Sequence, residues 1–278
     1  MTFSANGSPP SAPIASPESA PLVFITGASS GLGQALALRF YQAGWRLALV
    51  ARRDDAIRDW AAQLGWSPDR FWVGAADVSQ PDSIIAAAEA CLAQQGLPDV
   101  VIANAGISIG MDTAERSDLE VMARTFAVNN VGMAATFHPF VAPMRQRGHG
   151  SLVGIASVAA IRGLPGHGAY CASKAGVVSY CESLRGELRH SGVRVLTLTP
   201  GFIDTPLTRG NRYAMPFLMS APAFADRAFR AIQAGRSYTV IPWPMGIAAK
   251  VLRALPNRWY DRLMEGRGRK AREGESQS

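Results

Sequence analysis

The sequence has few of the features that mark secreted, metal-binding or membrane-spanning proteins. It contains only three cysteines in 278 residues, Cys91, Cys171 and Cys181, an odd number without the spacing of a metal site. Neither a disulfide framework nor a zinc site is therefore indicated. There is no uncharged apolar run of about eighteen residues or more, and the N-terminus lacks both a basic start and a continuous apolar core. We expect no spanning helix, no signal peptide, no bound metal and a cytoplasmic location.

Positive charge is also scarce outside the C-terminal region. The net charge is +7, and the stretch from Lys250 to Arg272 holds eight Lys or Arg residues against two acids, Asp261 and Glu265. The remaining chain is nearly neutral, whereas a nucleic-acid-binding domain carries its basic residues along a groove or stripe of the folded body. We expect no nucleic-acid partner.

The composition changes at about residue 21. Residues 1–20 are rich in Pro, Ser and Ala and have almost nothing large to bury, which predicts a disordered leader. The whole chain is 48% apolar, enough for a sizeable core. We expect one folded domain over residues 21–242 and a separate extension over 243–278.

Short apolar runs alternate with amphipathic stretches along this domain. The runs have the character of strands buried on both faces: 22–26, 46–51, 71–75, 100–103, 151–156 and 193–199. The stretches between them have helical spacing: 32–43, 54–64, 81–95, 119–146 and 170–190. Pro139 and Pro143 predict a kink or an early end in the fourth helix. The alternation predicts an α/β fold, a Rossmann-like doubly wound parallel sheet with helices on both faces.

A glycine-rich segment, T-G-A-S-S-G-L-G from Thr26 to Gly33, follows the first strand directly. Its glycines, Gly27, Gly31 and Gly33, allow a tight turn and close backbone approach to a pyrophosphate at a helix N-terminus. The spacing differs from G-x-G-x-x-G, so a purely structural turn is the alternative interpretation.

Tyr170 and Lys174 are four residues apart and share one face if the segment is helical. An ammonium beside a phenol favours the phenolate and moves the group toward useful proton transfer. An ordinary helix with one half-buried aromatic and one solvated charge would have the same pattern, so the pair alone does not decide between the two interpretations.

Seven motifs in order carry a resemblance to the short-chain dehydrogenases/reductases over roughly residues 22–206. They are T-G-x-x-x-G-x-G at Thr26 to Gly33, Asp77 with Val78, the N-A-G of Asn104 to Gly106, Asn129 in V-N-N-V-G, Ser157 thirteen residues before the tyrosine, Tyr170 with Lys174, and Pro200-Gly201 followed by Thr205. The resemblance implies about seven strands in the order 3-2-1-4-5-6-7. It also implies a homo-dimer or homo-tetramer.

The resemblance further implies site residues and roles. Tyr170 would exchange a proton with the substrate oxygen, Ser157 would donate to the developing alkoxide, and Lys174 would hold the nicotinamide ribose. Asn129 would hold a water that resupplies the proton. The implied cofactor-binding residues are Thr26, Gly27, Ser29, Ser30, Gly31, Leu32, Gly33, Arg52, Arg53, Asp77, Val78, Asn104, Ala105, Gly106, Tyr170, Lys174, Pro200, Gly201, Ile203 and Thr205.

The end of the second strand bears on the choice of cofactor. NAD enzymes of this family usually place an Asp there, but this chain has Ala51 followed by Arg52 and Arg53. Because a guanidinium can hold a phosphate in a bidentate way, NADP(H) is favoured over NAD(H), with Arg52 as the main contact. The alternative is a pair of solvated charges, partly neutralised by Asp54 and Asp55.

The end of the chain varies most within the family. Residues 206–219 resemble the mobile substrate lid, and their apolar side chains mildly favour a lipophilic substrate. A helix over 221–234 and an edge strand over 237–241 are expected next. Residues 243–278 form a basic amphipathic extension that could lie on an anionic membrane, on a partner subunit or on its own domain. His167, three residues before Tyr170, could touch the substrate, but a histidine in a solvated loop is the favoured expectation.

The sequence thus predicts an oxidoreductase that transfers a hydride between NADP(H) and a carbonyl or secondary alcohol substrate. The alternative is a non-catalytic NAD(P)-binding sensor or scaffold with the same fold. A pseudo-enzyme of that kind should have lost part of Ser157, Tyr170 or Lys174, and this chain has kept all three.

Overall fold

The computed structural model describes residues 20–209, 211, 214–266 and 268–274. All but the last residue of the expected leader, 1–20, lies outside these described residues.

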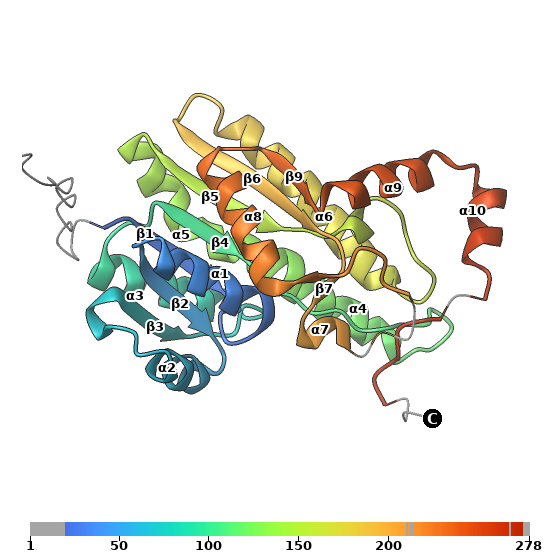
Figure 1. The fold of residues 1–278 in the computed structure, drawn as a ribbon, viewed down its shortest axis with the longest axis horizontal. Coiled ribbons are helices and arrows are strands. Elements are labelled where there is room, and N and C mark those ends of the chain that lie inside the picture. The colour runs from blue at the N-terminus through green and yellow to red at the C-terminus, as the bar shows by residue number, and fades with distance from the viewer. Residues whose placement is uncertain (1–19, 210, 212–213, 267, 275–278) are drawn as a thin grey trace, which may run out of the picture.

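A seven-stranded parallel sheet forms the centre of the fold (Figure 1). Its order is β3-β2-β1-β4-β5-β6-β9, and every neighbouring pair is parallel. The Rossmann-like sheet and the implied strand order are confirmed, with β9 as the seventh strand. The strands are β1 (Leu22–Thr26), β2 (Arg46–Ala51), β3 (Phe71–Ala75), β4 (Val100–Ala103), β5 (Gly150–Ile155), β6 (Val193–Pro200) and β9 (Tyr238–Ile241).

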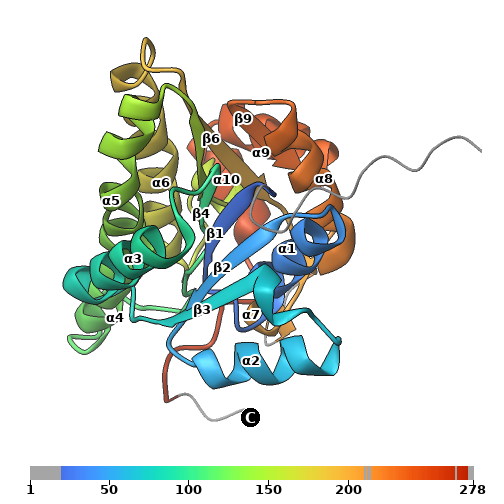
Figure 2. The same ribbon diagram turned by 90° about the vertical axis from the view of Figure 1, so that its left-hand side faces the viewer.

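Helices cover both faces of the sheet (Figure 2). One layer contains α1 (Gly31–Gln42), α2 (Asp54–Gln63) and α8 (Ala221–Gln233); the other contains α3 (Pro81–Gln95), α5 (Gly132–Arg147) and α6 (Gly168–Glu187). Alternate residues of β1 face opposite layers: Val23 and Ile25 pack with α1 and α8, and Leu22 and Phe24 pack with the other layer. All four are buried. This two-sided burial explains why the strands are continuous apolar runs.

The long helix expected over residues 119–146 is interrupted, but not at its prolines. It consists of α4 (Asp118–Phe126), a π-helical segment (Ala127–Val131) and α5, which includes Pro139 and Pro143 and continues to Arg147. The early end expected at the prolines is therefore wrong. The helix ends instead at Gly148, whose left-handed backbone (φ 79°) is typical of a glycine that terminates a helix.

The chain after β6 covers one end of the sheet. A small parallel pair, β7 (Ile203–Asp204) and β8 (Met219–Ser220), flanks α7 (Pro206–Arg209). After β9 follow α9 (Trp243–Ala254) and α10 (Asn257–Met264), and the chain then runs back toward α4 (Figure 1). Among the described residues, no helix is long and apolar enough to cross a membrane.

Candidate active site

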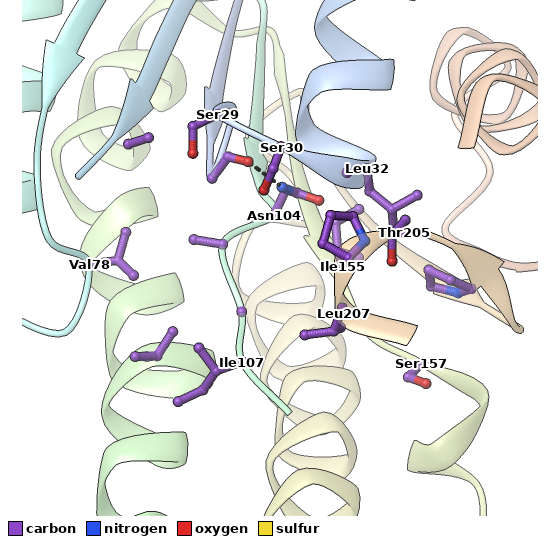
Figure 3. Close-up of a pocket in the computed structure, with 18 of the residues that line it drawn as sticks. Ser29, Ser30, Leu32, Val78, Asn104, Ile107, Ile155, Ser157, Thr205 and Leu207 are labelled. Carbon is purple, nitrogen blue, oxygen red and sulfur yellow. Dashed lines mark hydrogen bonds between the residues drawn. The ribbon is translucent and has the colours of Figure 1, made fainter. Parts of the chain in front are cut away.

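A cavity of about 620 Å³ lies along the carboxyl ends of the central strands. Parallel strands bring the residues that follow them to one edge of the sheet, where α/β folds bind ligands. Figure 3 shows Asn104 beside Ser29 and Ser30, with Ser157 on the other side of the pocket. The predicted site residues that line this cavity are Gly27, Ser29, Ser30, Gly31, Leu32, Arg52, Arg53, Asp77, Val78, Asn104, Ala105, Gly106, Ser157, Tyr170, Lys174, Pro200, Gly201, Ile203 and Thr205.

Three predicted residues, Thr26, Gly33 and Asn129, lie behind the cavity wall. Thr26 Oγ1 accepts hydrogen bonds from the backbone N–H groups of Asn104 (3.1 Å) and Ala105 (3.2 Å). Gly33 packs so closely on the preceding turn that a Cβ atom there would lie 2.2 Å from the Gly27 carbonyl oxygen. Thr26 and Gly33 shape the loop between β1 and α1 and do not line its open side.

The turn after β1 requires glycine at position 27. Gly27 has a φ of +68°, and a Cβ atom there would lie 2.9 Å from Ala105 Cα. The close approach brings the loop against the end of β4 and leaves the N-terminus of α1 open to the cavity. A loop of this kind, with a helix N-terminus behind it, fits a pyrophosphate, so the residues present fit a dinucleotide.

Two arginines occupy the end of β2. Arg52 and Arg53 are exposed and line the cavity. Asp54 pairs with Arg58 (3.6 Å), and among the described residues no ion pair joins Arg52 or Arg53 to an acid. The partial neutralisation considered from the sequence is therefore not formed as an ion pair, and both guanidinium groups remain available to an anionic ligand.

Asp77 is fixed at the end of the next strand. Its carboxylate accepts hydrogen bonds from the backbone N–H (2.9 Å) and the hydroxyl (2.8 Å) of Ser79. Burial alone would raise the pKa of Asp77, but these bonds and the charge of Arg52 outweigh it and hold the pKa below its usual value. The carboxylate is thus a stable acceptor at neutral pH.

Tyr170 and Ser157 meet at the inner end of the cavity. Burial raises the pKa of Tyr170 above its ordinary value, and a hydrogen bond with the Ser157 side chain partly opposes this rise. Ser157 Oγ also accepts a hydrogen bond from Ala159 N (3.2 Å), so its hydroxyl is held in place. The lowered tyrosine pKa expected from a nearby ammonium is not found, and burial determines the direction of the pKa shift. A protonated phenol at neutral pH is a proton donor.

Lys174 lies one helical turn after Tyr170 and is only 5% exposed. Its Nζ donates to the Ile155 carbonyl oxygen (2.8 Å) and lies 5.9 Å from the centre of the Tyr170 ring. Burial lowers the pKa of Lys174 to about 8. The lysine is therefore a buried base close to the phenol, and not the solvated charge of an ordinary helix.

Asn129 joins three parts of the site from the π-helical segment. Its Oδ1 accepts from Ile107 N (2.9 Å), and its Nδ2 donates to the Ile107 carbonyl (3.0 Å) and to Ser173 Oγ (2.9 Å). A Cβ atom on Gly106 would lie 3.2 Å from Asn129 Oδ1 and 3.3 Å from Lys174 Nζ. Oδ1 and Nζ therefore flank the small space that this glycine leaves.

A second cavity of about 660 Å³ adjoins the first. The two share Ser157, Tyr170, Gly201, Leu207 and Thr208 in their walls, so they meet at the candidate catalytic side chains. The expected lid contributes to the second cavity through Leu207, Phe217 and other residues of 206–219. Tyr213, also expected in the lid, lies outside the described residues.

The extension after residue 242 forms much of the remaining wall of the second cavity. Residues of α9 and α10, among them Met245, Leu252, Tyr260 and Met264, line it. Tyr260 Oη donates to the Gly163 carbonyl (2.5 Å), and the Arg162 guanidinium stacks 3.8 Å from the centre of the Tyr260 ring. The extension therefore packs on its own domain, one of the three alternatives left open by the sequence.

The final described residues cross the body and are tied to it. Arg272 holds the buried Asp118 through two bonds, Nε to Oδ2 (2.7 Å) and Nη2 to Oδ1 (3.2 Å). These bonds, with one from the Asp112 N–H, hold the pKa of Asp118 below its usual value. The sequence alone gave no sign of this contact, because 154 residues separate the partners.

His167 and Cys171 lie close to Tyr170 in the sequence, and both are buried. His167 was expected in solvent, but it is buried at the start of α6 and lines the second cavity, so that expectation is wrong. Burial, together with the charge of Lys270, lowers the pKa of His167 to about 4, which leaves the ring neutral at pH 7. Cys171 is also buried, and burial raises the pKa of its thiol, which disfavours a nucleophilic role.

The sequence missed other residues of the first cavity. They are apolar residues or residues without a motif: Ala76, Ser79, Ile107, Arg124, Val128, Ile155 and Ala156. Three of them, Ala76, Ile155 and Ala156, end or directly follow a strand, which is the one signal that could have identified them. The wall formed by α9 and α10 had no such signal.

Comparison with known proteins agrees with this geometry. The family model described as short chain dehydrogenase matches residues 21–215. An uncharacterized oxidoreductase of Myxococcus xanthus is 37% identical over 240 residues, which cover 85% of this chain and 93% of the relative. Among solved structures, a short-chain dehydrogenase/reductase of Burkholderia phymatum in complex with NAD has a TM-score of 0.75 at 25% identity, covering 83% of this chain and 92% of the other.

A second solved structure, a short-chain dehydrogenase of Sphingobium yanoikuyae in complex with NADPH, has a TM-score of 0.71 at 27% identity and covers 85% of this chain and 97% of the other. Its cofactor differs from that of the Burkholderia protein, so the likeness supports a nicotinamide cofactor without distinguishing between the two. From the family match, the relative and the geometry of the site together, this chain belongs to the short-chain dehydrogenase family of oxidoreductases.

Proposed function

We propose that the protein transfers a hydride between NADP(H) and the carbonyl or secondary alcohol carbon of a lipophilic substrate. The observation that supports this most strongly is the position of Ser157 and Tyr170. Both line the dinucleotide-sized cavity and the mainly apolar one beside it, at the place where the two meet. A reacting carbon placed there would face both groups.

The chain's own residues then act on the substrate oxygen. When bound, the nicotinamide supplies the hydride. As the carbonyl π electrons move onto oxygen, Tyr170 gives its phenolic proton to that oxygen and Ser157 donates a hydrogen bond to the charge that develops. In the direction of oxidation, Tyr170 takes the proton from the alcohol. The raised pKa of Tyr170 suits the donor role at neutral pH.

Lys174 and Asn129 are proposed to restore the proton on Tyr170. Lys174 would hold the ribose hydroxyls as well, with the Nζ donors that Ile155 does not use. Asn129 Oδ1 uses one lone pair for Ile107, and its second can accept a water in the space beside Gly106. The proposed roles of Lys174 and Asn129 in resupplying the proton are supported by the position of Lys174 Nζ and Asn129 Oδ1 on either side of the space beside Gly106.

The preference for NADP(H) is proposed to depend on Arg52. We expect Arg52→Ala to raise KM for NADPH roughly tenfold or more, because a charge-assisted bond to the 2′-phosphate is lost. KM for NADH should change little. Steady-state kinetics with both cofactors measure this, and Arg227→Ala, at an exposed position on α8, is the matched control. An unchanged ratio of the two KM values would refute the role of Arg52.

Residues 243–278 could also contact a membrane or a partner subunit through the outer face of α9. α9 exposes Trp243 (68%), Ile247 (56%) and Val251 (57%), which lie on one side of the helix beside basic residues. We propose that this face contacts either an anionic membrane or a second copy in a homo-dimer or homo-tetramer. A truncation before Trp243 would also remove a cavity wall, so a double variant, Ile247→Ser with Val251→Ser, is the sharper probe.

Vesicle flotation and light scattering distinguish these roles. Flotation of the wild type with anionic vesicles that is lost in the double variant would support membrane contact. A dimer or tetramer that dissociates in the double variant would support the subunit contact. If both proteins are monomers and neither floats, the proposal for this face is wrong.

A further inference from the structure

The described residues that line the second cavity include positively charged side chains but no negatively charged ones. Its lining comes from three parts of the substrate side: the turn after β5, the described residues between Leu207 and Phe217, and α9, α10 and the segment that follows them. Most of the side chains are apolar. Among the described residues that line it there is no Asp or Glu, whereas two are cationic, Arg162 and Lys270. A cavity with this lining favours an apolar ligand that carries negative charge.

Arg162 already has partners for its guanidinium group. Its Nη1 donates to the carbonyl oxygens of Leu252, Arg253 and Leu255, and its Nη2 donates to Asn257 Oδ1 (3.1 Å). It also stacks on the Tyr260 ring. Because these bonds hold the end of α9 and the start of α10, Arg162 supports the wall and has little capacity for a ligand.

Lys270 differs from Arg162 in its bonding. Its Nζ donates to the Leu207 carbonyl oxygen (2.9 Å), and no ion pair joins it to an acid within the part of the chain that the structure describes. An ammonium has three N–H donors, so two remain. The side chain is half-buried, and burial lowers its pKa. A partly desolvated cation without a carboxylate partner gains from binding an anionic ligand.

Lys270 also lies close to the reacting end of the cavity. Its charge acts on His167, which is three residues before Tyr170 and lines the same cavity. Leu207, the acceptor of its bond, lines both cavities. His167 is neutral at pH 7 and does not compete for an anion.

The backbone around Lys270 is held on both sides, although it lies near the end of the chain. Ala271 accepts a hydrogen bond from Gly110 N (3.2 Å), and Arg272 makes its two bonds to Asp118. On the other side, Arg269 pairs with Asp112 (3.8 Å). These contacts fix the position of Lys270 relative to the cavity, which a ligand-binding residue requires.

From these contacts we infer that Lys270 binds a carboxylate carried by the substrate. The substrate is then an apolar carbonyl or alcohol compound that also carries an acidic group, such as an oxo or hydroxy acid. The inference rests on the proposed function and adds the class of substrate to it. Lys270 is a specificity-determining residue in this account and takes no part in the transfer of the proton.

Paired substrates test this inference. The probes are methyl ketones with a carboxylate at the far end of a saturated chain, over several chain lengths, and the methyl ester of each. We expect the wild type to prefer the acid of the best length, and Lys270→Met to lower the ratio of kcat/KM for acid to ester roughly tenfold or more. Lys270→Arg should keep most of the preference, because it keeps the charge.

The ratio of kcat/KM for acid to ester distinguishes an effect of the Lys270 charge from an effect of its hydrogen bond to the Leu207 carbonyl. If Lys270 only holds the lid through the Leu207 carbonyl, acid and ester will lose activity together, the ratio will stay constant and the inference is overturned. Lys250→Met is the matched control, since Lys250 is exposed on α9 and does not line the cavity. Turnover of the ester with an unchanged ratio would reject the inference alone and leave the proposed function standing.

A binding measurement decides the inference even without turnover. Decanoate and decanol are titrated calorimetrically into the full chain, as wild type and as Lys270→Met. We expect decanoate to bind the wild type more tightly than decanol, and the variant to lose that difference. Suppose that neither the keto acids nor their methyl esters are turned over, but that decanoate still binds the wild type more tightly than decanol and the variant loses this difference. The proposed function then fails and the anion site stands. Equal binding of decanoate to both proteins overturns the site.

Discussion

Tyr170→Phe is expected to lower kcat by about two to four orders of magnitude, while NADPH binds as it does to the wild type. The substitution removes a single oxygen from a side chain at the junction of the two cavities. Ring packing on α6 is kept, so the loss would come from the missing proton donor. Turnover of a ketone gives kcat, and quenching of tryptophan fluorescence gives the affinity for NADPH.

Tyr180→Phe is the control for Tyr170→Phe. Tyr180 lies on the same helix but is 37% exposed, away from both cavities. It should keep wild-type kcat. Near-wild-type turnover in Tyr170→Phe would contradict the assignment of the proton donor, and turnover lost together with NADPH affinity would point to a collapsed site instead.

Lys174→Met is expected to abolish most of the activity and yet to stabilise the fold at neutral pH. Burial lowers the pKa of Lys174 to about 8 from 10.5, so the folded protein at pH 7 holds a charge that it desolvates at a cost. A shift of this size corresponds to roughly 3 kcal/mol, and the unpaired Ile155 carbonyl in the variant offsets part of the gain. A net gain of about 1–2 kcal/mol in the free energy of unfolding is expected.

The stability gained by Lys174→Met over the wild type should depend on pH. Between about pH 8 and 10.5 the unfolded chain holds a proton on Lys174 that the folded chain has released. Wild-type stability from this group therefore rises with pH across that window, while below it the cost stays constant. The difference in stability between Lys174→Met and the wild type should then shrink as the pH rises from about 8 toward 10.

Chemical denaturation at several pH values measures this difference. Lys250→Met, at an exposed position, should give a difference near zero at every pH. A stability difference for Lys174→Met that stays constant or grows with pH would show that the lysine is not a desolvated base. If Lys174→Met keeps its activity, Lys174 is not needed to restore the proton on Tyr170.

Local patterns predicted the sheet and the first cavity well, because the relevant residues are close to strands. β1, β2, β3 and β4 begin and end where the apolar runs do. Their carboxyl ends meet at one edge in any parallel sheet, so Gly27, Arg52 and Asp77 could be placed together from the sequence. The pocket at this edge contains all three.

Contacts between distant segments were beyond the reach of sequence patterns. Asp118 and Arg272 are 154 residues apart, and nothing near either residue indicates the other. His167 is buried and lines the second cavity together with residues of the extension, which its neighbours along the chain did not indicate. The π-helical segment that carries Asn129 has no sequence signature either, and its role in joining Ile107 to Ser173 emerged only from the fold.

Transfer of deuterium from NADPH to a ketone is the sharpest test of hydride transfer by this protein. The full chain is incubated with NADPH that carries deuterium at the transferable position of the nicotinamide and with a panel of apolar ketones, and the alcohols are analysed by mass spectrometry. We expect deuterium on the carbinol carbon of at least one product, formed by the wild type and by Tyr180→Phe but not by Tyr170→Phe. NADPH that binds without transfer to any ketone, or equal transfer by Tyr170→Phe, would contradict it.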